Sequence, residues 1–110
     1  MDLAAGVVGL TKRLPRGFAE LRSQLQRSAL ATVRHIAEGA SRTSPSDKRA
    51  GFTVARGEVA ECDASLETVA TLPLAPSQQT QRLRILADRV GAMLAGLVRR
   101  EARRLAEPGA

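Results

Sequence analysis

Few side chains in this sequence are suited to catalysis. The chain contains one histidine, His35, one cysteine, Cys62, and no tyrosine, so most of its acids and bases are carboxylates. Glu58 and Glu61 share one edge of an expected helix, an arrangement that can serve acid–base chemistry or bind a metal. Bundles that hold two irons use Glu-x-x-His on two helices, and no Glu stands three residues before His35. We therefore expect no catalytic site, no metal, no cofactor and no small-molecule substrate.

Arginines near the carboxyl end are suited to a different task, the binding of phosphate. The 17 basic residues are mostly Arg and outnumber the 11 acids, which gives a net charge of +6. If this part of the chain is helical, several of its arginines point in a similar direction. The guanidinium group offers a rigid, bidentate donor to phosphate. The candidate nucleic-acid-binding residues are Arg82, Arg89, Arg99, Arg100, Arg103 and Arg104.

The basic composition leaves two interpretations open. A positive net charge favours anionic partners such as nucleic acid, but an Arg-rich proteome would give the same balance. A row of arginines can equally be a solvated helix face. With two Phe and no Tyr or Trp, the chain lacks aromatic platforms on which bases stack. Any nucleic-acid binding is therefore expected to involve the phosphate backbone and to be largely independent of sequence.

Helices are the elements that would position these residues. Because aromatic residues are so few, Leu, Val, Ile and Ala must fill the core, which is typical of helix bundles and not of β-sandwiches. Apolar residues at three- and four-residue spacing predict helices at about 2–14, 17–39, 45–72 and 77–106. Their short connections favour antiparallel neighbours. We predict one all-α domain over residues 1–110, an antiparallel up-down-up-down four-helix bundle.

Local signals mark the helix ends. Gly39 stands where a left-handed C-cap residue belongs, so we expect the second helix to end there. Ser44 precedes Pro45, and Asp47 follows three residues after Ser44, which is a strong start signal for the third helix. Ser77 is the expected cap of the fourth.

Each long helix has an apolar face at helical spacing. In the second helix the residues are Phe18, Leu21, Leu25, Ala29, Thr32, Ile36 and Ala40. In the third they are Phe52, Ala55, Val59, Cys62, Leu66 and Val69. In the fourth they are Leu83, Leu86, Val90, either Met93 or Leu94, and Leu97, with Leu105 left open.

The second helix is apolar over a wider arc than one partner helix needs. Leu30, Val33 and Ala37 lie beside its main face, and small residues such as Ser28 and Ala31 would let another backbone come close. This pattern favours self-association. The expected interface residues are Leu30, Val33, Ala37 and Glu38.

Two stretches carry a resemblance to a known family: LRSQLQRSALATVRHIAEGASRTS and FTVARGEVAECDASLE. They resemble the four-helix-bundle family of 23S rRNA intervening-sequence proteins. The matching residues are Gln24, Leu25, Arg27, Ile36, Ala37, Glu38, Gly39, Arg42, Ala55, Gly57 and Glu61. We expect Gln24, Arg27, Glu38, Gly39, Arg42, Gly57 and Glu61 to be structural. The sequence departs from the family pattern at Ser28, His35 and Glu58, where the family has Ala, Asn and Ser.

The resemblance implies a homopentameric barrel of four-helix bundles without known enzymatic activity. A related branch, the accessory variability determinants of diversity-generating retroelements, forms basic pentamers that associate with a reverse transcriptase and its RNA. The expected function is a non-enzymatic oligomeric adaptor that binds RNA, or an RNA–protein complex, through a basic surface. The alternative is a structural scaffold that binds only protein partners.

The expected compartment is the cytoplasm. A single cysteine can form no internal disulfide, which fits a reducing environment. The apolar stretch at residues 3–10 follows Asp2 and precedes Lys12 and Arg13, the reverse of the charge order of a signal peptide, so it is interpreted as a helix. No run approaches the roughly 18 apolar residues of a membrane span.

Overall fold

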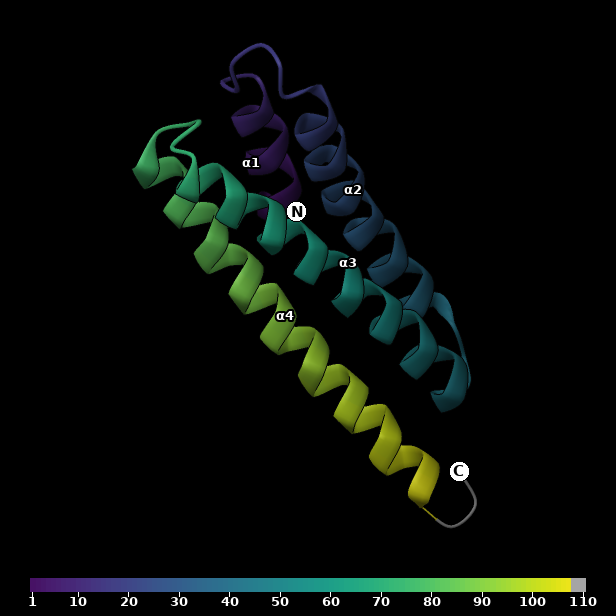
Figure 1. Ribbon diagram of the computed structural model, residues 1–110. Coiled ribbons are helices and arrows are strands. Elements are labelled where there is room, and N and C mark those ends of the chain that lie inside the picture. The colour runs from purple at the N-terminus through teal and green to yellow at the C-terminus, as the bar shows by residue number, and fades with distance from the viewer. Residues whose placement is uncertain (108–110) are drawn as a thin grey trace.

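The computed structural model describes residues 1–107, which fold into four helices joined by short connections (Figure 1). They are α1 (Asp2–Thr11), α2 (Ala19–Ser41), α3 (Pro45–Thr71) and α4 (Ser77–Ala106), and these residues include no strand. Within them α1 and α3 each pack against both α2 and α4, whereas the backbones of α1 and α3, and those of α2 and α4, do not come close to each other. Where α1 is present, the four helices therefore occupy the corners of a square; the whole body measures 55 × 19 × 18 Å. The expected all-α fold with four helices is confirmed.

α1 covers only one end of this body (Figure 1). It has 10 residues against 30 in α4, so it is about 30 Å shorter. It ends at Thr11, before the predicted position 14, and Gly17 then takes a φ of +96°, a conformation that only glycine adopts without strain. Arg22 of α2 donates to the carbonyls of Thr11 and Leu14, both at 3.2 Å, and so holds the turn against α2.

α2 continues past Gly39, so the predicted C-cap at this residue is wrong. Gly39 is buried within the helix, which ends at Ser41 before the extended Arg42. The glycine is needed for space: a Cβ added to Gly39 would lie 2.9 Å from Cδ1 of Phe52, and one added to Gly51 would lie 2.7 Å from Cα of Gly39. The backbones of α2 and α3 thus touch at a pair of glycines that face each other.

The two later helices begin differently. In α3, Ser44 accepts a hydrogen bond of 3.1 Å from the backbone N–H of Asp47, the cap expected from the sequence. In α4 the N-cap is Pro76 and no side chain caps the helix, so the predicted Ser77 cap is wrong. The carbonyl of Pro76 instead accepts hydrogen bonds from the N–H and hydroxyl of Thr80, at 3.0 and 3.1 Å.

The hydrophobic core forms where the helices meet, and all six predicted apolar-face residues of α3 are buried in it. In α4, Leu94 is fully buried whereas Met93 is 50% exposed, so Leu94 is the core residue of that pair. Leu105 is 43% exposed and lies outside the core. No helix within residues 1–107 combines the length and the hydropathy needed to cross a bilayer.

Candidate nucleic-acid interface

α4 carries most of the net charge of the protein. It contains seven arginines and two acids, a net charge of +5 out of the +6 of the whole chain. Arg103 and Arg104 lie in its last turn, where the helix dipole favours cations. The basic character of the chain is therefore a property of this one helix.

Five of the six candidate arginines are exposed and are spread along α4, with three of them near one line and Arg103 and Arg99 displaced from it by about 60° and 100° around the helix axis. These residues, called the arginine row below, are Arg82, Arg89, Arg99, Arg100 and Arg103. At 1.5 Å per residue the row is about 32 Å long. Within residues 1–107 none of its members takes part in an ion pair. Its guanidinium groups are thus not paired with carboxylates of the described residues.

Arg104 has a different environment. It donates to both carboxylate oxygens of Glu101, at 3.0 and 3.1 Å. The Glu101 side chain is only 3% exposed, and a buried carboxylate requires an opposite charge. Arg104 therefore neutralises Glu101 and adds less positive charge to the surface than its neighbours do.

A depression lies beside the first part of the arginine row. It has a volume of about 410 Å³ and is lined by Gln78, Gln81, Arg82, Ile85, Leu86 and Arg89. Ile85 is 45% exposed, so the floor presents apolar surface between two guanidinium groups. This α4 depression combines cationic, amide and apolar contacts.

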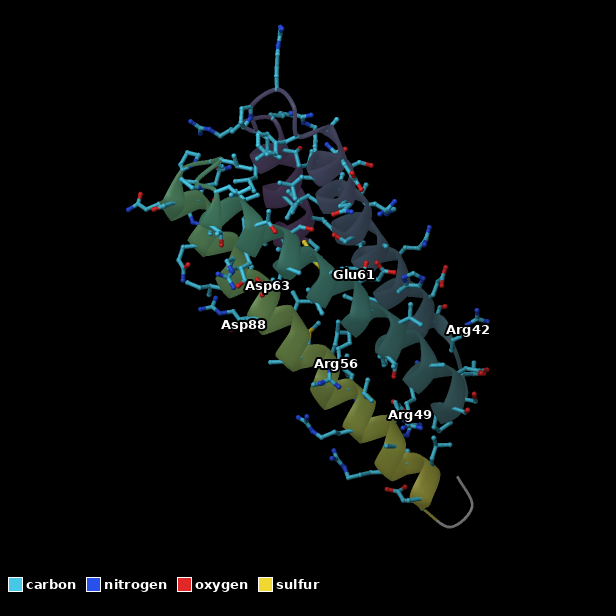
Figure 2. The ribbon with its side chains drawn as sticks, viewed as in Figure 1. Arg42, Arg49, Arg56, Glu61, Asp63 and Asp88 are labelled. Atoms are coloured by element: carbon cyan, nitrogen blue, oxygen red, sulfur yellow. The ribbon has the colours of Figure 1, made fainter. Side chains whose placement is uncertain are left out.

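The flank of α4 that faces α3 is acidic as well as basic. Arg84 donates to Asp63 of α3 at 3.2 Å, and this hydrogen bond raises the pKa of Arg84. Figure 2 shows Asp63 and Asp88 close to each other, with Arg56 further along the same two helices. These three residues line a groove of about 540 Å³ whose other lining residues are Val59, Ala60, Ala87, Gly91, Ala92 and Ala95. The carboxylates make this flank unsuitable for phosphate.

The residues that carry the family resemblance lie in several places. Gln24, Arg27 and Glu61 line one polar cleft of about 270 Å³ between α2 and α3, together with Ser28 and Ser65. The Ser28 hydroxyl, at a position where the family pattern has Ala, donates to the carbonyl of Gln24 at 2.8 Å and so is satisfied within its own helix. The fold thus brings together residues from both of the stretches that resemble the family.

The remaining motif residues have separate environments. Gly39 permits the close approach of α2 to α3, whereas an added Cβ at Gly57 would have no neighbour within 4 Å. Glu38 and Arg42 are exposed, and neither forms an ion pair with another residue of the described range. His35 replaces the Asn of the family pattern, and its Nδ1 is buried with no hydrogen-bond partner in residues 1–107.

The predicted oligomer interface is an exposed apolar edge of α2. Leu30 is 55% exposed and Val33 is 36% exposed, and Ala37 and Glu38 are also exposed. Leu30, Val33 and Ala37, called the α2 edge below, are not buried by any other part of residues 1–107.

The residues considered for catalysis lie in different environments. Cys62 is buried, and burial raises the pKa of its thiol to about 11, so the thiolate is scarce near neutral pH. Glu61 lines the polar cleft, and Glu58 is not one of its lining residues. In the part of the chain that the structure describes, no three His, Cys, Asp or Glu side chains are grouped to hold a metal ion.

Two polar residues that matter in the structure were missed by the sequence reasoning. Glu101 is buried, and its spacing of seven residues from Leu94 would have placed it on the inner face of α4. Gln79 has a buried Oε1 without a hydrogen-bond partner in residues 1–107. Nothing in the local sequence distinguishes Gln79 from its neighbour Gln78.

Comparison with known proteins agrees with this architecture. No curated protein matches the sequence. The family model described as 23S rRNA-intervening sequence protein matches residues 1–96, a range that includes all of α1, α2 and α3 and two thirds of α4. The match contains Arg82 and Arg89 and ends before Arg99. The chain therefore belongs to the 23S rRNA-intervening sequence protein family.

Proposed function

We propose that this antiparallel four-helix bundle is a non-enzymatic adaptor that assembles into a homo-oligomer and binds RNA, alone or in a complex with protein. The observation that carries the proposal is the arginine row: five exposed guanidinium groups, unpaired as far as residue 107, spread over about 32 Å of one helix. Arginines in this state can each contact a phosphate at no cost in broken ion pairs. The description of the family, 23S rRNA-intervening sequence protein, names a ribosomal RNA and so supports an RNA context for the chain.

Self-association would strengthen this binding. The α2 edge exposes Leu30 and Val33 to water, and covering them would remove apolar surface from solvent. An oligomer repeats the arginine row once per subunit, so several weak phosphate contacts act on one RNA. We propose that the α2 edge and Glu38 form this interface, with a pentamer as the expected assembly.

Two measurements test the proposal. Light scattering at micromolar concentration should give several times the chain mass of 11.7 kDa. Fluorescence anisotropy with two unrelated structured RNAs should show binding to both, with log affinity falling by about 0.9 per phosphate contact against log salt. Arg82→Glu/Arg89→Glu/Arg100→Glu should weaken binding to both RNAs equally and lower the slope by about 2 to 3.

A matched variant separates position from total charge. Arg13, Arg16 and Arg49 are exposed outside α4, so Arg13→Glu/Arg16→Glu/Arg49→Glu changes the net charge by the same amount. It should keep most of the affinity and slope. Equal losses in both variants would mean that only the overall charge matters, and no binding by the unaltered protein at low salt would reject the RNA function.

A scaffold that binds only protein is the second candidate. The groove between α3 and α4 favours it, because its walls are mostly alanine and glycine, side chains that allow a helix of another protein to approach closely. If the unaltered protein is oligomeric and fails to bind RNA at low salt, this function replaces the first.

A further inference from the structure

The side of α2 that faces α1 continues as an apolar surface where α1 is absent. Arg22 marks this side, because it donates to the carbonyls of Thr11 and Leu14 at the end of α1. Val33 and Ala40 follow Arg22 by 11 and 18 residues and so project from α2 within about 20° of it. Val33 is 36% exposed and Ala40 is exposed, so no other part of residues 1–107 buries them.

The side of α4 that faces α1 continues in the same way. Leu86 marks this side, since it lines a pocket of about 420 Å³ together with Asp2 and Gly6 of α1. Met93 and Leu97 follow Leu86 by 7 and 11 residues, again within about 20° of it. Met93 is 50% exposed and Leu97 is half-buried. The four residues that flank this position, called the open corner below, are Val33, Ala40, Met93 and Leu97.

A helix fits the open corner, because α1 itself occupies the same position at the other end of the bundle (Figure 1). α1 has 10 residues and α4 has 30, so α4 extends about 30 Å further than α1 does. The backbones of α2 and α4 do not come close to each other along their length. A helix laid between them would cover exposed apolar side chains on both, which favours its binding.

The border of the open corner on α4 is basic. Arg82 lines the pocket beside α1, and Arg89 and Arg100 follow it by 7 and 18 residues, so all three project from nearly the same side of α4. Arg89 and Arg100 are exposed, and neither forms an ion pair with another of the described residues. A ligand in the open corner therefore lies next to two free guanidinium groups.

The nearby acids of α2 and α4 point away from the open corner. Glu38 follows Val33 by five residues and projects about 140° from it around α2. Asp88 precedes Met93 by five residues and projects about 140° from it around α4. The other acid of α4, Glu101, is buried within an ion pair. The charge that these two helices present beside the corner is therefore positive, which is complementary to an acidic ligand.

From these observations we infer that the open corner binds an amphipathic helix of a partner protein, with apolar side chains toward α2 and α4 and acidic side chains beside Arg89 and Arg100. This ligand is additional to the proposed RNA and does not depend on it, but both use the same two arginines and therefore compete. Leu30 and Ala37 of the α2 edge project about 60° and 40° further around α2 than Val33, so copies of the chain can still meet there.

The probe for this site is a labelled peptide of about 18 residues with leucines on one face of the helix and glutamates on both flanks. Fluorescence anisotropy should show binding at least about tenfold tighter than that of a scrambled peptide, which has the same composition and charge but no apolar face. Replacing the glutamates with glutamines should weaken binding about threefold to tenfold, because the contacts with two guanidinium groups are lost.

Uncharged variants test the apolar surface. Met93→Gln should weaken binding of the glutamate peptide at least about threefold, since Met93 is covered in the complex. Ile85→Gln makes the same kind of change at a residue of α4 that is 45% exposed and projects about 100° from Leu86. It should leave binding unchanged.

Matched arginine variants test the basic border. Arg89→Gln/Arg100→Gln should remove the difference between the glutamate and glutamine peptides. Arg99→Gln/Arg103→Gln has the same net charge, but these residues lie further around α4, about 120° and 80° from Met93. This second variant should keep the difference.

The outcomes separate the helix site from the RNA function. Equal binding of the glutamate and scrambled peptides, or equal losses in Met93→Gln and Ile85→Gln, overturns the helix site and leaves RNA binding intact. A lower oligomer mass of Met93→Gln in light scattering also overturns it, because another copy of the chain would then fill the corner. Peptide binding without RNA binding at low salt supports the helix site and rejects the RNA function. If both bind, saturating peptide should weaken RNA binding, and an unchanged RNA affinity contradicts the shared arginines.

Discussion

Replacing Gly51 with alanine should force α2 and α3 apart. An added Cβ at this position would lie 2.7 Å from Cα and 3.1 Å from the backbone nitrogen of Gly39. Carbon atoms pack at about 3.5 to 4.0 Å, so the two main chains must separate by about 1 Å. A change of side-chain rotamer cannot relieve this contact, because both partners belong to the backbone.

Two effects of opposite sign set the size of the change. Alanine is favoured over glycine inside a helix by about 1 kcal/mol. Overpacking costs about 1 to 3 kcal/mol, and the upper part of that range applies where a backbone must move. We expect Gly51→Ala to lower the free energy of unfolding by about 1 to 2 kcal/mol, a decrease in Tm of at least about 4 °C.

Gly57 in the same helix provides the control. An added Cβ there would have no neighbour within 4 Å, so Gly57→Ala should show only the helix-propensity gain, about 0.5 to 1 kcal/mol of added stability. Thermal and urea unfolding followed by circular dichroism, at one protein concentration and with the oligomer mass measured for each variant, compares the two. The reasoning is refuted if Gly51→Ala is as stable as Gly57→Ala.

Three further predictions concern single side chains. Ser44→Ala should lower the free energy of unfolding by about 1 kcal/mol in urea titrations, because the Asp47 N–H loses its cap; no change would mean that water replaces the cap at no cost. Arg104→Met should lower the free energy of unfolding by about 1 to 3 kcal/mol, because it leaves the buried Glu101 carboxylate unpaired. Arg103→Met should change the same free energy by no more than about 0.5 kcal/mol, and equal effects of the two variants would contradict the ion-pair assignment. Burial raises the pKa of the Cys62 thiol from 9.0 to about 11, so the unfolded chain loses this proton at a lower pH than the folded protein does. The free energy of unfolding should therefore fall as the pH rises between these two values, by at most about 1.4 kcal/mol per pH unit. Urea titrations across this range should show a shallower decrease for Cys62→Ala, and the same slope in both proteins would refute it.

Local patterns in the sequence were sufficient for much of the fold. The number of helices and the buried face of α3 follow from apolar spacing, and the Ser44 cap follows from residue types within one turn. Gly39 could not be interpreted in this way, because a glycine near a helix end serves equally as a C-cap and as a point of close contact. What decides between them is Gly51, twelve residues later and on another helix.

The candidate site was predictable only in part for the same reason. Helical spacing was enough to identify an exposed row of arginines on α4, and five of the six candidates are exposed. The pairing of Arg104 depends on the burial of Glu101, which is set by the packing of α4 on its neighbours. A pocket lined by Asp2 and Gly6 of α1 and by Gln79, Arg82, Leu83 and Leu86 of α4 forms where α1 packs against α4, and no pattern within either helix specifies that packing.

The two halves of the arginine row should therefore contribute differently to RNA binding. Arg82 and Arg89 lie within the range that matches the family and line the α4 depression, whose walls also include amide and apolar side chains. Arg99, Arg100 and Arg103 lie beyond that range, on the part of α4 that α1 does not reach (Figure 1). Membership of the family therefore carries no information about this second cluster, whose role depends on charge and exposure alone. A cluster of that kind raises association rates and adds affinity that salt removes, but it cannot discriminate between bases. Contacts that depend on more than charge must therefore come from the first half of the helix, where Gln78, Gln81 and Ile85 line the α4 depression together with Arg82 and Arg89.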